Sequence, residues 1–134
     1  ESNFTAFPGA DTDDCAGAIG QTICGEPLPT YKHRATANWS NDDWTAMLSW
    51  RFVGVVKDDD PGALYFAEKI DGFNYFDASA TYRFTDNYAV TFGIDNLFDE
   101  KPPLLGDNQE QANTYPATYD VFGSTYFLRM TADF

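Results

Sequence analysis

The sequence predicts an all-β fold, and more narrowly a segment of an antiparallel transmembrane β-barrel. Several stretches alternate apolar and polar residues, as strands do when one face meets an oily phase and the other meets water. The connections between these stretches alternate between long and short, and aromatic residues gather at the stretch ends. Strand length, loop alternation and ring placement are together typical of a sheet that crosses an outer membrane.

The expected elements follow the chain in order. Tight turns are expected at Asn41-Asp42 and at Thr85-Asp86-Asn87. Long loops are expected over residues 8–30, 55–71 and 99–120. Six strands are expected over residues 2–7, 31–41, 43–54, 72–84, 88–98 and 122–134. Residues 1–134 are therefore expected to be the C-terminal part of one β-barrel domain.

The last expected strand shows the alternation most clearly. Its apolar positions are Tyr126, Leu128, Met130, Ala132 and Phe134, and its polar positions are Thr125, Arg129, Thr131 and Asp133. Phe127 is the exception, a large apolar residue on the polar side. A soluble sheet also alternates, so this strand alone leaves a soluble β-sandwich open. A sandwich would pack Trp50, Phe92 and Leu128 inside a water-soluble core.

The polar sides of the strands carry charged residues, which suit a wide, wet lumen. These inward positions are Lys32, Arg34, Asn38, Arg51, Asp77, Arg83, Asp95 and Arg129. A spanning sheet must close, because unpaired backbone groups are not tolerated in lipid. Six strands are too few for a bacterial single-chain barrel, which begins at about eight. The chain is therefore expected to belong to a much larger barrel.

Aromatic residues are expected to form a belt at the short-turn end of the sheet, the level of the periplasmic membrane surface. These residues are Trp39, Trp44, Phe84, Tyr88 and Phe134. Rings with polar tips favour a membrane–water interface. Core packing is the alternative, but these faces carry Ala beside large rings rather than the Val, Ile and Leu of cores.

Composition excludes some classes of function. The net charge of −13 disfavours a nucleic-acid partner, which needs clustered Lys and Arg. Cys15 and Cys24, close together in an expected loop, indicate one small disulfide, with zinc as the weaker alternative. The acidic groups Asp11, Asp13, Asp14 and Asp58-Asp59-Asp60 match no calcium-loop spacing, so solvated loops are favoured over calcium. His33 falls on an outward face, away from any cleft, and no catalytic motif occurs, so no enzyme is expected.

Two stretches resemble a known family. Phe92-Gly-Ile-Asp-Asn-Leu-Phe-Asp-Glu-Lys-Pro-Pro103 resembles the penultimate strand and following loop of TonB-dependent outer-membrane receptors, and Asn113-Thr-Tyr-Pro-Ala-Thr-Tyr-Asp-Val-Phe-Gly123 resembles the run-in to their final strand. The cysteine loop ending in Cys24-Gly-Glu-Pro27, with Tyr31-Lys-His-Arg34 after it, is similar to a loop of many members. Many members have Gly-Arg-x-Tyr where this chain has Gly123-Ser124-Thr125-Tyr126, so a salt bridge from that Arg is not expected here.

The resemblance implies the last six strands of a barrel of about 22 strands in the bacterial outer membrane, with a periplasmic C-terminus. It implies energised uptake of a scarce ligand, such as a ferric siderophore, cobalamin or an oligosaccharide. The implied partners are the remaining barrel strands, a plug domain, the TonB complex acting through the plug, the barrel-assembly machinery, outer-membrane lipid and the ligand.

The resemblance also implies roles for particular residues. Candidate ligand contacts in the loops are Tyr65, Phe66, Asn108, Gln111, Asn113 and Tyr115, with ordinary loop packing as the alternative. Tyr126, Leu128, Met130 and Phe134 resemble the signal that the assembly machinery reads. A smaller pore or adhesin barrel, and a soluble glycan-binding sandwich, are the rival functions.

Overall fold

The computed structural model of the 134-residue chain describes residues 3–5, 8, 12–20, 23–60, 62 and 66–133. No helix within these ranges is long and apolar enough to cross a membrane. The chain divides into two compact units, each described by itself. The loop unit comprises Glu1–Lys32, Phe52–Phe73 and Lys101–Val121, and the sheet unit comprises His33–Arg51, Asn74–Glu100 and Phe122–Phe134.

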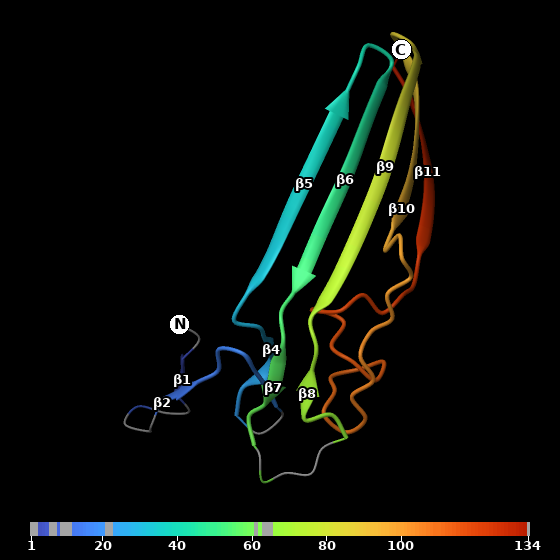
Figure 1. Ribbon diagram of the computed structural model, residues 1–134. Helices are drawn as coiled ribbons and strands as arrows, with labels where there is room; N and C mark the ends of the chain where they lie inside the picture. Colours follow the sequence, from blue (N-terminus) through green and yellow to red (C-terminus); the bar gives the residue numbers. More distant parts are fainter. Residues whose placement is uncertain are drawn as a thin grey trace. The chain divides into compact units, whose positions relative to one another are not determined.

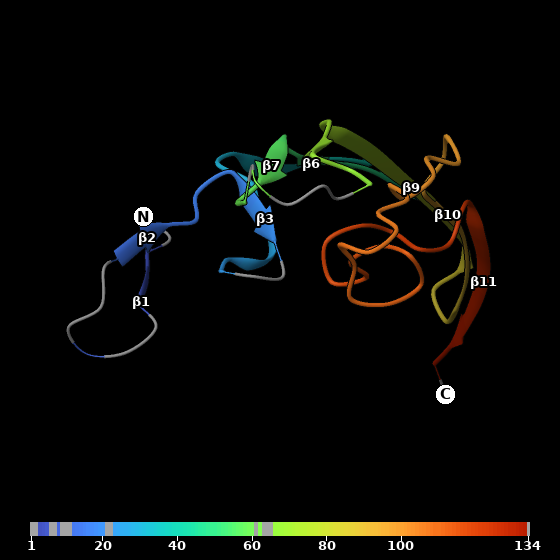
Figure 2. The same cartoon turned by 90° about the horizontal axis from the view of Figure 1, so that it is seen from below.

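The sheet unit is built on a five-stranded sheet with the order β11-β10-β9-β6-β5. Figure 1 shows the five long strands side by side, and Figure 2 shows the sheet curving from β6 towards β11. These strands overlap the expected ranges 31–41, 43–54, 72–84, 88–98 and 122–134. Their bounds are β5 (Lys32–Ser40), β6 (Trp44–Val53), β9 (Phe73–Thr85), β10 (Tyr88–Asp95) and β11 (Thr125–Ala132).

The register of β10 sorts its residues and those of its antiparallel neighbours into two faces. On the outward face, Phe92 lies opposite Leu128 in β11 and Ala80 in β9. On the inward face, Thr91 lies opposite Arg129 and Thr81. Large apolar side chains therefore share the outward face, and polar side chains share the inward face.

The short connections of the sheet are closed by local hydrogen bonds. The Asn41 amide donates to the Trp44 carbonyl (2.8 Å) in the β5–β6 turn. In the β9–β10 turn the Tyr88 amide donates to the Thr85 hydroxyl (3.1 Å). The end of the chain is tied to the same turn, because the Asp133 amide donates to the Asn87 carbonyl and the Asn87 side chain donates to the Asp133 carbonyl. Both turns therefore connect strands in which apolar and polar residues alternate, as the sequence predicts.

β10 ends at Asp95, earlier than the expected 98, and the reason is a change in backbone conformation. Asn96 has a φ of 52° and Asp99 a φ of 57°. This left-handed region is incompatible with a strand, and Asn and Asp tolerate it better than other non-glycine residues.

The loop unit contains short strands that sequence reasoning did not expect. The segments treated as loops over 8–30 and 55–71 hold a four-stranded sheet of order β4-β3-β7-β8, in which β3 and β7 run parallel. Such short strands give no detectable periodicity. The bounds are β3 (Ala18–Gly20), β4 (Gly25–Leu28), β7 (Val56–Asp58) and β8 (Lys69–Ile70).

The first expected strand, 2–7, differs from the structure in its pairing. β1 (Asn3–Thr5) pairs with β2 (Thr12–Asp14) in a separate two-stranded sheet rather than joining the five long strands. Ser2, Ala6 and Phe7 lie outside the described residues.

A buried hydrophobic cluster forms the core of the loop unit. It draws on all three chain segments of the unit, with Tyr119 edge-on to the half-buried Phe73 ring at a centroid distance of 5.2 Å. A connection with its own apolar core is a folded element rather than a solvated tether. The cluster consists of Ile19, Val56, Ile70, Leu105, Tyr115 and Tyr119.

Candidate functional site

The outward face of the sheet exposes large apolar side chains that a water-soluble core would bury. Leu128 is 69% exposed, and Trp50 and Phe92 are exposed as well. Tyr126 and Met130, two further residues of the expected assembly signal, lie on this face and are exposed. Phe134 lies outside the described residues. A contiguous apolar face of this kind needs an apolar partner.

Aromatic rings gather on the outward face at the short-turn end of the sheet. The Trp44 ring packs on Tyr82 at a centroid distance of 4.7 Å, and Phe84 stacks on Tyr88 at 6.0 Å. Trp39 is exposed near the end of β5. Four of the five rings expected in the belt are therefore at this end of the sheet.

A second group of rings lies towards the other end of the same strands, and sequence reasoning missed it. Trp50 stacks on Phe76 (6.0 Å, 2° between planes) and meets the edge of His33 (4.4 Å). The Trp50 indole N–H donates to the Asn74 side chain (2.9 Å). Phe98 packs edge-on to Phe76 at 5.3 Å. The alternation already placed Trp50 and Phe76 on the apolar face. Their shared position along the strands was the signal that could have identified this second group of rings.

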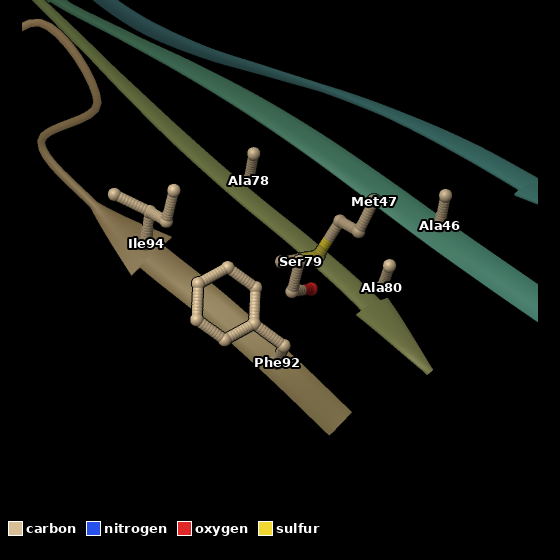
Figure 3. A pocket seen from close by; sticks show the side chains of 7 residues that line it. All are labelled: Ala46, Met47, Ala78, Ser79, Ala80, Phe92 and Ile94. Carbon is tan, nitrogen blue, oxygen red and sulfur yellow. The ribbon is translucent and has the colours of Figure 1, made fainter. Parts of the chain in front are cut away.

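Small side chains between these rings leave a shallow apolar hollow of about 240 Å³. Figure 3 shows Ala46, Ala78 and Ala80 beside Phe92 and Ile94 from three neighbouring strands. Because these residues are small, the rings beside them project further from the face of the sheet. Hydrocarbon chains can fill the space between the rings, which no side chain of a folded core fills here.

The inward face carries a charged pair at the end of the sheet away from the short turns. The Arg51 guanidinium pairs with the Asp77 carboxylate (3.2 Å) and lies over the Tyr75 ring, 5.0 Å from its centroid. Asp77 also accepts the backbone amide of Asn96 (3.1 Å). This pair links β6, β9 and the end of β10 through one carboxylate.

Asn96 is the centre of a second set of hydrogen bonds and is only 2% exposed. Its side-chain amide donates to the carbonyls of Glu100 (2.8 Å) and Phe122 (3.4 Å), and its side-chain oxygen accepts the Glu100 amide (2.9 Å). The Ser124 hydroxyl donates to the Asn96 carbonyl (2.7 Å), and the Ser124 amide donates to Asp99 (3.0 Å). Asn96 therefore joins the two ends of the long connection between β10 and β11.

Phe127, the exception to the alternation, is explained by Gly93. The two residues are paired in the register, and the Phe127 ring covers Gly93 so closely that a side chain there would collide with it. The ring fills the space that glycine leaves on the inward face, which shields the backbone as cross-strand aromatic–glycine pairs do.

The candidate ligand contacts fall into two groups. Asn108 and Tyr115 are 1% and 4% exposed. The Asn108 side chain donates to Asp58 (3.0 Å) and accepts the Tyr115 hydroxyl (3.4 Å), so both residues take part in loop packing. Phe66 is 78% exposed, and Gln111 and Asn113 are exposed. Tyr65 lies outside the described residues.

The cysteine loop is closed by a disulfide and held by one acidic side chain. Cys15 and Cys24 are joined, with Cα atoms 5.5 Å apart. The Asp59 carboxylate accepts the backbone amides of Ile23 (3.2 Å) and Cys24 (2.7 Å). Asp59 also packs against Gly20, where a Cβ would collide with it. Two loops distant in sequence are thus fastened together.

The carboxylates of the acidic run Asp58-Asp59-Asp60 accept hydrogen bonds from backbone amides. The Asp58 carboxylate accepts a hydrogen bond from the Asp60 backbone amide (2.7 Å), and the Asp60 carboxylate accepts one from the Gly62 backbone amide (3.0 Å). Burial, and then repulsion from Asp59 and Asp60, raise the pKa of Asp58. Within the described part of the chain, no three His, Cys, Asp or Glu side chains are grouped to hold a metal ion. Calcium binding by Asp13, Asp14 and Asp58-Asp59-Asp60 is therefore unconfirmed, and Asp11 lies outside the described residues.

An antiparallel curved sheet with an apolar exposed face, a polar face and ring-lined ends defines the sector of a membrane β-barrel. The family model described as "TonB dependent receptor-like, beta-barrel" matches residues 2–97. The chain belongs to this family of TonB-dependent receptor barrels.

Similar proteins agree with this assignment. The chain is 29% identical over 109 residues to the vitamin B12 transporter BtuB of Vibrio cholerae, which covers 80% of this chain and 16% of that protein. It is 25% identical over 119 residues to the ferric enterobactin receptor PirA of Pseudomonas aeruginosa, covering 82% and 16%. The chain thus spans about a sixth of the length of these relatives, whose names are those of transporters and receptors rather than enzymes.

Solved structures show the same fold. The ferric enterobactin receptor PfeA of Pseudomonas aeruginosa superposes with a TM-score of 0.62 at 24% identity, over 82% of this chain and 17% of that protein. The copper transporter OprC superposes with a TM-score of 0.52 at 23% identity, over 82% and 18%.

Proposed function

We propose that this chain is the C-terminal barrel sector of a TonB-dependent active transporter in the bacterial outer membrane. The observation that carries the proposal is the exposed apolar face of the five-stranded sheet, on which Phe92 and Leu128 lie opposite each other midway along β10 and β11. An apolar face of this size fits lipid, and the opposite polar face fits a water-filled lumen. The family assignment supports both faces of this interpretation.

The two groups of rings support a particular position for the sheet in the membrane. Trp44 and Tyr82 mark one level, and Trp50 and Phe76 mark the other. The levels are six residues apart on each strand, which is about 20 Å along the strand. Rings at both edges of an apolar band are the anchors of outer-membrane barrels. We assign the short-turn level, and with it the C-terminus, to the periplasmic side.

The loop unit is the proposed ligand-facing part. Its disulfide, its buried cluster and the Asp59 hydrogen bonds hold a preformed surface, which lowers the ordering cost of binding. Phe66, Gln111 and Asn113 present an apolar ring and amide groups on that surface. Stacking on a ring and hydrogen bonding to amides suit a compact organic ligand or chelate.

The transport proposal is tested with the full-length receptor in its own cells. Cobalamin and ferric enterobactin, the ligands named for the relatives, are the first probes. The proposal expects uptake of a probe to stop when the receptor gene is deleted, when TonB is deleted, or when a protonophore collapses the proton gradient. Uptake that needs the receptor but continues without TonB and without the gradient would indicate a passive pore instead.

A further inference from the structure

A second apolar hollow lies on the outward face of the sheet unit. It crosses β5, β6 and β9, which Figure 1 shows as neighbours, and has a volume of about 270 Å³. Its lining residues are Ala35, Thr36, Ala37, Leu48, Trp50 and Phe76. The alanines of β5 project little from the sheet, whereas the exposed Leu48 and Trp50 of β6 project further and wall the hollow. Hydrocarbon therefore makes up nearly all of the lining.

The ring-lined end of this hollow carries a hydrogen-bond donor. Trp50 and Phe76 stack with their planes 2° apart, and the Trp50 indole N–H donates to the Asn74 side-chain oxygen (2.9 Å). This bond orients the Asn74 amide, because its oxygen is the atom that can accept from the indole. Asn74 is exposed, and within the described residues its side chain makes no further hydrogen bond. Its NH₂ group is therefore available to an oxygen acceptor outside the sheet.

The hollow of Figure 3, on the same face, provides a contrast. Among the residues that line it, the one polar side chain is Ser79. Ser79 lies opposite Gly93 in the register, in the inward set of residues, so it offers nothing to an occupant on the outward face. One hollow thus has a donor beside its rings, and the other has alanines, Phe92 and Ile94 alone on that face.

We propose that the hollow beside Trp50 binds one acyl chain of a membrane lipid, and that the ester carbonyl of this chain accepts a hydrogen bond from the Asn74 side chain. The inference rests on the proposed function, because it needs the outward face to meet lipid. A lipid has its ester oxygens where the acyl chains begin, which is the level at which interfacial rings lie. The chain then runs from the Trp50–Phe76 rings along the alanines of β5.

The lining favours an acyl chain over a protein partner. An alkyl chain has no polar group along its length and adapts its shape, so it gains dispersion contacts with every wall of an irregular apolar hollow. A specific protein–protein interface buries about 1,000 Å² or more and needs polar groups at its rim. This hollow offers one small apolar surface with a single free donor at one end.

The test uses the full-length receptor in vesicles of phosphatidylethanolamine doped with the same lipid carrying a diazirine midway along one acyl chain. Irradiation attaches the probe to the nearest side chains, and mass spectrometry of peptides locates the labels. The proposal expects stronger labelling of β6 around Leu48 than of β10 and β11 around Phe92 and Leu128, where no donor holds a lipid. Equal labelling of these strands would overturn it.

Three variants separate the hydrogen bond from the hollow. Asn74→Asp keeps an oxygen for the Trp50 indole but loses the donor, so labelling of β6 should fall roughly fivefold, the effect of one hydrogen bond. Ala37→Leu fills the hollow and should remove the excess labelling of β6. Ala80→Leu is the matched control, the same change in the hollow of Figure 3, and should label β6 as the wild type does. Heat-modifiable migration in gels shows that each variant has folded.

The outcomes separate the lipid site from the proposed function. Labelling of β6 that is unchanged in Asn74→Asp and Ala37→Leu overturns the lipid site and leaves the transporter proposal standing. Cross-links from the hollow to a second receptor or to another protein, in place of lipid labels, also overturn it, because the occupant would then be a polypeptide. Labels on inward positions such as Arg129, with none on the outward face, overturn the lipid site and the proposed function together.

Discussion

The sheet unit and the loop unit differ in where they place their large apolar residues. The sheet unit turns its large apolar residues outward and leaves them exposed, whereas the loop unit buries Ile19, Val56 and Leu105 in a core of its own. The arginines are on the strands of the sheet unit, and the lysines Lys57, Lys69 and Lys101 are in the loop unit. The loop unit also has the disulfide.

The proposed function accounts for this difference, because it puts lipid around the sheet unit and water around the loop unit. A sheet in lipid gains nothing by hiding its apolar face, and its backbone hydrogen bonds hold it together. A loop cluster in water must bury apolar area to offset the entropy of ordering, and a cross-link reduces that entropy cost. Substitutions should therefore have effects that depend on the unit in which they are made.

The largest effect is expected in the loop unit, from a cavity. Leu105→Ala removes a fully buried side chain and should destabilise the loop unit by about 3 kcal/mol. Leu104→Ala, at an exposed neighbouring position, is the control and should change little. Hydrogen exchange of the β3 and β7 amides in the full-length receptor measures the loss. Equal exchange in both variants would mean that the cluster is no core.

A charge on the outward face should have the next largest effect. Leu128→Arg places a cation where lipid is expected and should cost about 2 kcal/mol of barrel stability. Thr125→Arg in the same strand points inward opposite Asp95 and should be tolerated. Urea unfolding of the receptor in lipid vesicles compares them. If Leu128→Arg is as stable as Thr125→Arg, the outward face does not meet lipid.

The connection between β10 and β11 should depend on Asn96 to a smaller extent. Asn96→Ala loses three side-chain hydrogen bonds. Alanine also keeps the left-handed backbone conformation without the side-chain bonds that stabilise it in Asn96, so the total cost should be about 1–2 kcal/mol. Asn96→Gly loses the same bonds but relieves the backbone strain, so it should cost less. Proteolysis of the 101–121 connection measures both. Cleavage that is no faster than in the wild type would show that Asn96 does not hold the two ends.

The smallest effect is a pH dependence of the loop unit. Burial raises the pKa of Asp58 above its ordinary value of 3.8, so the folded form binds its proton more tightly than the unfolded form does. Stability contributed by the protonated side chain is therefore present below the unfolded pKa and lost as pH rises through the folded pKa. Asp58→Asn should remove this slope, as hydrogen exchange of β7 between pH 4 and pH 7 would reveal. If the pH dependence of stability persists in Asp58→Asn, another titratable group causes it.

The sheet unit could be predicted from the sequence because each of its long strands contains several alternations. Trp50, Phe92 and Leu128 fell on the apolar face for that reason, and the structure leaves them exposed. The sheet of the loop unit could not be predicted, since strands such as Lys69–Ile70 have no period and pair with partners distant in sequence. The burial of Asn108 and Tyr115 could not be predicted, because Asn108 bonds to Asp58 and Tyr115 packs in the cluster with Val56, both far along the chain.

The central claim is that the outward face meets lipid and the inward face meets water. Its most direct measurement places a spin label on single cysteines at positions 128, 129, 130 and 131 of the full-length receptor in vesicles, with Cys15 and Cys24 already joined. Labels at Leu128 and Met130 should collide with dissolved oxygen, and labels at Arg129 and Thr131 with a water-soluble nickel complex. Accessibility that does not alternate, or that shows water at 128 and 130, would contradict the account.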